Sequence, residues 1–179
     1  MTLLIRNGTL ITASETFQAD ILITGELIQA IGKDLMPNCN ECETVDASGK
    51  LILPGGVDPH THFNLPMFDT VSSDDHYTGL KAAAFGGTTT VLDFVPQEPG
   101  SLQTSVEAWH ARADTLAAID FGFHMNITRF SAQVAAEIPH IAEVGISSLK
   151  VFTAYNNRLR LSDGDIFQVL RIAKEHGLL

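Results

Sequence analysis

The stretch TTTVLDFVPQEPGSLQTSVEAWHARADTLAAIDFGFHMNIT, residues 88–128, indicates the fold of this chain. Its two ends, residues 88–95 and 119–128, are short apolar runs of the kind that form buried strands. Residues 101–118 between them have the length and the apolar spacing of a helix. Two buried strands joined by a helix form the crossover unit of a parallel sheet, so the stretch predicts an α/β fold.

The same alternation continues on both sides of this stretch. The further elements that we expect are a strand at 51–57, a helix at 72–87, a helix at 131–145 that Pro139 interrupts, a strand at 147–155 and a capped helix at 162–177. With residues 178–179 as the start of another strand, four units and the beginning of a fifth predict the first half of a (β/α)8 barrel of the TIM type. A doubly wound open sheet has the same periodicity, but no glycine-rich phosphate loop follows the first strand.

Residues 1–52 have a different pattern, which predicts antiparallel β-structure. Asn7-Gly8 and Gly25 each stand between apolar runs, where they predict the turns of two hairpins. A polar loop, residues 33–50, follows. We therefore expect two domains: a β-strand-rich part over residues 1–52, and the first half of the barrel over residues 53–179.

The composition excludes some partners. The 179 residues are 45% hydrophobic and carry a net charge of −10, which disfavours nucleic-acid and anionic-membrane partners. The N-terminus does not resemble a signal peptide and no long apolar run occurs, so we expect a soluble, cytoplasmic protein. Cys39 and Cys42 form a C-x-x-C without a second pair, which favours a polar loop over a redox or zinc site.

Two histidines stand at the carboxyl end of the first barrel strand, in GGVDPHTHFNLP, residues 55–66. Active sites of parallel barrels lie at this end of the strands. His60 and His62 are two residues apart, so in a continuing strand both imidazoles point to the same side and can bind one cation. The position in the barrel makes a metal site the favoured interpretation of this H-x-H.

A lysine stands in the apolar fourth strand, SSLKVFTAY, residues 147–155. Burial lowers the pKa of a lysine amine, and the neutral amine of Lys150 can add carbon dioxide to become a carbamate. That anion has two oxygens and can bridge two cations about 3.5–4 Å apart. The alternative is a lysine whose ammonium reaches solvent at the barrel mouth, and the strand alone favours this alternative.

These motifs, with DDHYTGLKAAAFGGTTTVLDF and DFGFH between them, resemble in order and spacing the hydantoinase and dihydropyrimidinase branch of the cyclic amidohydrolases. The resemblance implies a (β/α)8 barrel with a small flanking β-sandwich. It implies two zinc ions, with His60 and His62 on one metal and carbamylated Lys150 (N6-carboxylysine) bridging both. It further implies that Tyr155 hydrogen-bonds the tetrahedral oxyanion, and that the full-length protein forms a homotetramer or homodimer.

The resemblance also bears on the substrate. Dihydroorotases place an arginine just after the H-x-H, and allantoinases continue with a Glu-Pro-Gly-Arg-like segment, whereas no Arg or Lys occurs here between His62 and Lys81. A neutral cyclic amide or ureide, hydantoin or dihydrouracil, is therefore expected. Four apolar residues resemble those that line the pocket for the ring substituent, and they fit small local cores equally well. These are Phe63, Leu65, Phe152 and Leu159.

Three alternatives remain. The chain could come from an allantoinase-like or dihydroorotase-like cyclic amidase, or from a non-catalytic assembly protein of the collapsin-response-mediator type. A mononuclear deaminase is disfavoured because such a site does not need the bridging lysine. The retention of His60, His62, Lys150 and Tyr155 together favours the enzyme.

Other polar residues have less specific interpretations. His124 and Asp93 lie on barrel strands, where inward packing or hydrogen bonds at the rim are favoured over a role behind the metal ligands. His76, His110, His140 and His176 fall in expected helices. The family needs two further histidines and an aspartate, which we expect beyond Leu179. We therefore expect that the 179-residue chain alone does not catalyse this hydrolysis.

Overall fold

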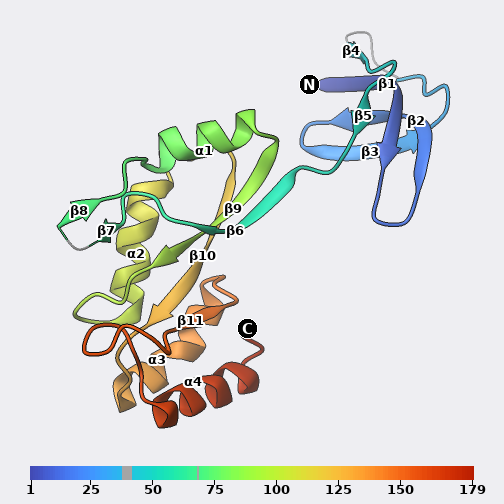
Figure 1. Ribbon diagram of the computed structural model, residues 1–179. Coiled ribbons are helices and arrows are strands. Elements are labelled where there is room, and N and C mark those ends of the chain that lie inside the picture. The colour runs from blue at the N-terminus through green and yellow to red at the C-terminus, as the bar shows by residue number, and fades with distance from the viewer. Residues whose placement is uncertain (38–41, 68) are drawn as a thin grey trace. The chain divides into compact units, whose positions relative to one another are not determined.

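The computed structural model describes residues 1–37, 42–67 and 69–179, which form two compact units, Met1–Pro54 and Gly55–Leu179 (Figure 1). Cys39, half of the C-x-x-C, lies outside the described residues. Each unit has its own buried apolar residues and is described by itself. In the described part of the chain, every helix is too short or too polar to cross a membrane.

The N-terminal unit is built on one mixed sheet with the strand order β3-β2-β1-β4, in which β5 also pairs with β1. The first three strands are antiparallel, and β4 and β5 run parallel to β1. A small core of Leu10, Ala19 and Ile21 lies on one face. The strands are β1 Thr2–Ile11, β2 Thr16–Thr24, β3 Leu27–Gly32, β4 Glu43–Asp46 and β5 Leu51–Ile52.

The prediction of a turn at Asn7-Gly8 is wrong, because β1 runs straight through it. Asn7 has a φ of 62° and sits in a bulge where the β1–β2 register shifts, between Ile5 and Gly8. Asn-Gly favours a positive φ, which a bulge needs as much as a tight turn does. Gly8 also allows a close approach, since a Cβ there would lie 2.2 Å from the Cδ1 of Ile52. The turn at Gly25 between β2 and β3 is confirmed.

The C-terminal unit confirms the predicted alternation of strands and helices. Its parallel sheet has the order β11-β10-β9-β6 and curls, with helices following the strands (Figure 1). Its strands are β6 Gly56–Thr61, β9 Thr88–Val95, β10 Asp120–Ile127 and β11 Leu149–Val151, with a separate antiparallel pair of β7 Pro66–Met67 and β8 Thr70–Val71. Its helices are α1 His76–Phe85, α2 Leu102–Ala113, α3 Ala132–Glu143 and α4 Asp163–Glu175.

Three predicted boundaries are wrong in ways that local chemistry explains. The single strand expected at 51–57 is two strands in different units, separated around Pro54, which has no N–H to donate to a ladder. Helix α3 continues through Pro139, because buried side chains on both sides, Ile138 and Ile141, hold it against the core. The strand expected at 147–155 ends at Val151, and a tight loop follows.

The two faces of the parallel sheet differ. On one face Val95, Met125 and Ile127 are fully buried against helix residues such as Trp109 and Ile138. Burying each such side chain contributes about 1.5–3 kcal/mol, so this face holds the unit together. The other face carries Phe94, His124 and Lys150, because successive side chains of a strand point to opposite sides.

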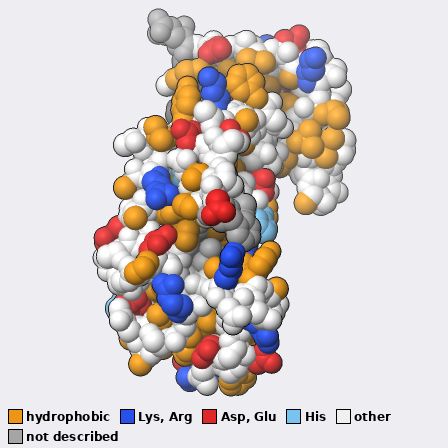
Figure 2. All heavy atoms as spheres, turned by 60° about the vertical axis from the view of Figure 1, so that its left-hand side comes forward, with side chains coloured by type: hydrophobic (Ala, Val, Ile, Leu, Met, Phe, Trp, Pro, Cys, Tyr) orange, Lys and Arg blue, Asp and Glu red, His pale blue; other side chains and the backbone are white. Residues whose placement is uncertain are grey.

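The surface carries no continuous basic area on the side that Figure 2 draws, where Lys and Arg side chains stand singly among acidic and apolar ones. Large apolar side chains are exposed in each unit. They include Leu27, Ile28 and Ile31 on β3 and Phe167 and Leu170 on α4.

Candidate metal centre

The parallel register brings the predicted ligands to one end of the sheet. His60 lies at the end of β6 and His62 directly after it, while Lys150 is the central residue of β11. Between them, Phe94 of β9 pairs with His124 of β10. A hollow of about 420 Å³ has His60, Phe94, His124 and Lys150 in its wall.

The ring of Phe94 is the common neighbour of these groups. Its centroid lies 4.7 Å from the ring of His60 and 5.0 Å from that of His62. The two imidazoles stand edge to face, with centroids 5.2 Å apart. The Nζ atom of Lys150 lies 3.9 Å from the Phe94 centroid, so strands that are distant in sequence present three nitrogen-bearing groups around one phenyl ring.

Lys150 lies between two aromatic rings. Its Nζ is 5.1 Å from the ring of Phe152 as well as close to Phe94, and the side chain is half-buried. The rings attract the ammonium form, whereas burial lowers the pKa of Lys150 below its ordinary value. A neutral amine is therefore easier to form here than on an exposed lysine.

His62 lies in a mixed electrostatic environment. Burial lowers the pKa of its imidazole, Asp93 opposes that effect, and Lys150 and His60 add to it. Its side chain is 34% exposed, but its Nδ1 atom is buried and has no hydrogen-bond partner among the described residues. The neutral imidazole, which is the metal-binding form, is thus favoured.

His124 uses both ring nitrogens within the protein. Its Nε2 lies 2.9 Å from the carbonyl oxygen of Pro59, so this nitrogen carries the proton and donates it. Its Nδ1 then accepts from the hydroxyl of Ser148. His124 therefore links the turn before His60 to the residue two positions before Lys150, and neither of its nitrogens is available to a metal. The sequence motif DFGFH indicates that this histidine lies on a barrel strand, but it does not predict that Pro59 and Ser148 are its hydrogen-bond partners.

Asp93 points to the helical side of the sheet and is 1% exposed. Its Oδ1 accepts the backbone N–H of Phe94 at 2.7 Å, and its Oδ2 accepts the indole N–H of Trp109 at 3.1 Å. His76, also 1% exposed, lies with its Nε2 3.3 Å from Oδ2. Sequence reasoning did not identify this buried cluster, because its members come from β9, α1 and α2.

The apolar residues expected around a substrate have different positions. Phe63 is buried in a local core with Leu80 and Val91, and packs so closely on Gly79 that a Cβ there would lie 2.2 Å from its ring. Leu65 is half-buried and packs against the main core. Phe152 borders Lys150, and the exposed ring of Tyr155 lies 6.0 Å from that of Phe152.

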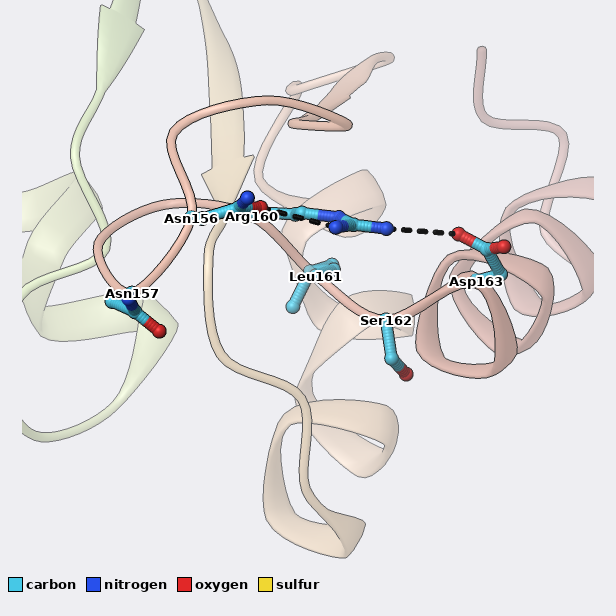
Figure 3. A pocket seen from close by; sticks show the side chains of 6 residues that line it. All are labelled: Asn156, Asn157, Arg160, Leu161, Ser162 and Asp163. Carbon is cyan, nitrogen blue, oxygen red and sulfur yellow. Dashed lines mark hydrogen bonds and ion pairs between the residues drawn. The ribbon is translucent and has the colours of Figure 1, made fainter.

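The loop after β11 holds Tyr155 in a constrained backbone. Tyr155 and Asn157 have positive φ values of 66° and 63°. The Arg160 guanidinium donates to the Oδ1 of Asn156 at 3.0 Å and faces the Asp163 carboxylate at 3.8 Å (Figure 3). A second hollow of about 550 Å³ lies in this loop and is lined by Asn156, Asn157 and residues 160–163, but not by Tyr155, Lys150 or either of the two histidines.

The donor set fits part of a divalent-metal site. Over the described ranges, no three His, Cys, Asp or Glu side chains group as a complete metal site would need. The candidate ligands that remain are the imidazoles of His60 and His62 and the amine of Lys150, which can become a carbamate. Zinc binds such nitrogen and carboxylate-like oxygen donors. The Nδ1 atom of His62 is buried 4.0 Å from the carboxylate of Asp93, the kind of group that accepts the second N–H of a metal-bound histidine, although no hydrogen bond joins the two atoms here.

Known proteins resemble this chain both in sequence and in fold. No family model matches it. It is 44% identical over 181 residues to the D-hydantoinase of Geobacillus stearothermophilus, covering 100% of this chain and 38% of the relative. It is 39% identical to the dihydropyrimidinase of Dictyostelium discoideum, covering 99% and 36%. The crystal structure of dihydropyrimidinase from Brevibacillus agri NCHU1002 matches with a TM-score of 0.94 and 47% identity, over 99% of this chain and 39% of that one.

The chain thus spans less than two fifths of the length of these curated relatives. Within that span both sequence and fold agree from the first strand to the last helix. By sequence and by structure, the chain belongs to the hydantoinase and dihydropyrimidinase family, of which it corresponds to the N-terminal part.

Proposed function

We propose that a protein carrying this chain hydrolyses a ring C–N bond of a cyclic amide, hydantoin or a 5,6-dihydropyrimidine, at a two-metal centre. The observation that supports this most is the convergence of His60, His62 and Lys150 on the ring of Phe94. The relatives' names, D-hydantoinase and dihydropyrimidinase, support the reaction class. A parallel half-sheet of this kind also fits a complete (β/α)8 barrel.

Lys150 contributes as a carbamate in this proposal. The neutral amine attacks carbon dioxide, an N–C bond forms, and the proton displaced from nitrogen passes to water. The product is an anion on a long side chain, with two oxygens for two cations. Its position in a half-buried hollow beside Phe94 and Phe152 favours the uncharged amine from which it forms.

The imidazoles of His60 and His62 would hold one cation, and the carbamate on Lys150 would bridge it to a second, most consistently zinc. Bound divalent cations would supply Lewis-acid polarisation of the ring carbonyl and a water of lower pKa. Tyr155 would donate its phenol to the carbonyl oxygen as charge develops there, and Phe152 would border the ring. A donor of this kind typically contributes about 3–4 kcal/mol to the transition state.

The substrate is proposed to be neutral. Between His62 and Lys81 the sequence has no Arg or Lys to bind a substrate carboxylate. Hydantoin and dihydrouracil fit this segment better than dihydroorotate does. Ring opening of hydantoin, dihydrouracil, allantoin and dihydroorotate by the intact protein, each with added Zn²⁺, distinguishes these substrates.

The variant Lys150→Ala tests the proposal. We expect it to lose the two-metal centre and nearly all ring-opening activity, with partial rescue by short carboxylic acids that replace the carbamate. Lys81→Ala is the matched control, because Lys81 also lies over an aromatic ring, that of Tyr77 at 5.4 Å, but on helix α1. Metal content and hydrolysis rate are measured for both variants of the intact protein.

Two results would contradict the proposal. Full activity and unchanged metal content in Lys150→Ala would remove the bridging role. An intact wild-type protein that binds no zinc and opens none of the four rings would instead favour a non-catalytic assembly protein.

A further inference from the structure

The Nδ1 atom of His62 is a buried polar atom whose surroundings determine its protonation. It has no hydrogen-bond partner in the described part of the chain. The nearest carboxylate oxygen in an ion pair with it is Oδ1 of Asp93, at 4.0 Å, too long for a hydrogen bond. The other charged or titratable groups that act on this ring are Lys150 and His60.

Asp93 is held so that it cannot turn away from His62. Its Oδ1 accepts the backbone N–H of Phe94, and its Oδ2 accepts the indole N–H of Trp109. His76 closes the Oδ2 side at 3.3 Å without the alignment of a hydrogen bond. Helices α1 and α2 therefore fix the carboxylate from behind, at 1% exposure.

A neutral imidazole can carry its proton on either nitrogen. With the proton on Nε2, the lone pair of Nδ1 would face a carboxylate oxygen in a water-poor site, which is repulsive. With the proton on Nδ1, an N–H dipole faces the carboxylate, which is attractive, and the distance can shorten by a small rotation of the ring. Low local dielectric strengthens this difference.

We propose that Asp93 is a positioning residue that keeps His62 in the Nδ1–H tautomer, so that Nε2 presents its lone pair to the face of the sheet that bears Phe94 and Lys150. The tautomer is a property of the chain itself. Its use, to offer Nε2 to a divalent cation, rests on the proposed function. A carboxylate behind a ligand histidine fixes the orientation of the ring and raises its basicity.

The test is the tautomer of His62, read from the ¹⁵N resonances of its two ring nitrogens in the ¹⁵N-histidine-labelled chain at mildly alkaline pH. Asp93→Asn alone is a poor variant, because both carboxylate oxygens accept N–H groups and an amide NH₂ would face one of these donors. Trp109→Phe removes the donor at Oδ2 and keeps the carboxylate. We therefore compare Trp109→Phe with the double variant Trp109→Phe/Asp93→Asn. The difference between them reports the effect of the negative charge of Asp93 on the His62 tautomer.

We expect the wild-type chain and Trp109→Phe to show a protonated Nδ1 and an unprotonated Nε2 on His62. In the double variant the ratio of Nδ1–H to Nε2–H should fall about tenfold, which corresponds to about 1.4 kcal/mol. His124 is an internal reference, since its Nε2–H is fixed by Pro59 and should not change. An Nε2–H proton on wild-type His62, or an equal ratio in the two variants, overturns the inference.

Zinc added to the same samples separates this inference from the proposed function. If the tautomer is as expected and Zn²⁺ also shifts the Nε2 resonances of His60 and His62, both hold. If the tautomer is as expected and Zn²⁺ leaves these resonances unchanged in the intact protein as well, the positioning by Asp93 stands and the proposed metal centre does not.

Discussion

Phe94 sets the chemistry of the residues around it. The rings of three histidines, His60, His62 and His124, lie within 5.0 Å of its centroid, and the Nζ of Lys150 lies closer still. Burial at this ring lowers the pKa of His62 and of Lys150, which disfavours the charged forms of these two side chains. The same ring attracts a cation through its quadrupole, so it holds the Lys150 side chain in place while burial eases the loss of its proton.

The two hydrogen bonds of His124 are expected to stabilise the fold. His124→Ala removes the bonds to Pro59 and Ser148 and leaves the Pro59 carbonyl without its partner. We expect a loss of about 2 kcal/mol in the free energy of unfolding, since each bond contributes about 1 kcal/mol. Urea unfolding of the chain measures it.

His124→Gln is the matched variant, because its amide can still donate to the Pro59 carbonyl. We expect it to recover part of the loss, and to keep the backbone amide resonance of His60 close to its wild-type position. Equal urea midpoints for the wild type and His124→Ala would show that the two bonds do not stabilise the fold.

Among the elements, helix α1 starts with a reciprocal cap. The Asp75 carboxylate accepts the backbone N–H groups of Tyr77 and Thr78, and the Thr78 hydroxyl accepts the backbone N–H of Asp75. The cap fixes the first residue of the helix, His76, beside Asp93. The start of α1 thereby shapes the cluster behind His62.

The cap predicts a pH dependence. Hydrogen bonds, above all the one from Thr78 N–H, hold the pKa of Asp75 below its ordinary value. A carboxylate with a lowered folded-state pKa stabilises the fold above its unfolded pKa of about 3.9, and this contribution is lost as the pH falls through the folded value. We expect Asp75→Asn, which can still cap but carries no charge, to be less stable than the wild type at neutral pH and to lack this loss in acid.

Urea midpoints at neutral pH and near pH 3 measure the effect, with Asp120→Asn as the control, because Asp120 is exposed on β10 and lies outside this cap. The difference between the wild type and Asp75→Asn should narrow on acidification. A difference that stays constant down to the acid end would mean that the charge of Asp75 does not contribute through this cap.

At the scale of the whole molecule, the two units have separate cores. Unit Gly55–Leu179 contains the main core, with fully buried Met125, Ile127 and Ile138, and all residues of the candidate centre. We expect residues 55–179 to fold without residues 1–54. In that shorter chain the ring resonances of His60, His62 and His124 should match those of the 179-residue chain.

The N-terminal unit, Met1–Pro54, is expected to behave differently when it is expressed alone. Residues 1–54 have a small core and leave Leu27, Ile28 and Ile31 exposed, so we expect them to be less stable alone. If residues 55–179 instead show the far-ultraviolet circular dichroism of an unfolded chain, the centre depends on the N-terminal unit.

Sequence reasoning predicted the parts of the site that depend on local patterns. The period-two spacing of His60 and His62 and the isolated charge of Lys150 in an apolar strand are visible in one dimension. Phe94, Asp93 and the two bonds of His124 were not predicted as a set, because each depends on the register between strands. The turn predicted at Asn7-Gly8 was wrong for a related reason. A positive φ is compatible with a turn or with a bulge, and the pairing with the neighbouring strand determines which of the two forms.

The sequence by itself determined the order of strands and helices, the ends at which the candidate ligands stand and the net acidity, because periodicity and composition are properties of neighbouring residues. Only the tertiary structure decided that His60, His62 and Lys150 meet at Phe94, that Phe63 is buried in a local core, and that Asp93 lies behind His62. These contacts join residues tens of positions apart. Parallel register sets which side chains lie across from one another, and it depends on which face of each strand is buried in the folded unit.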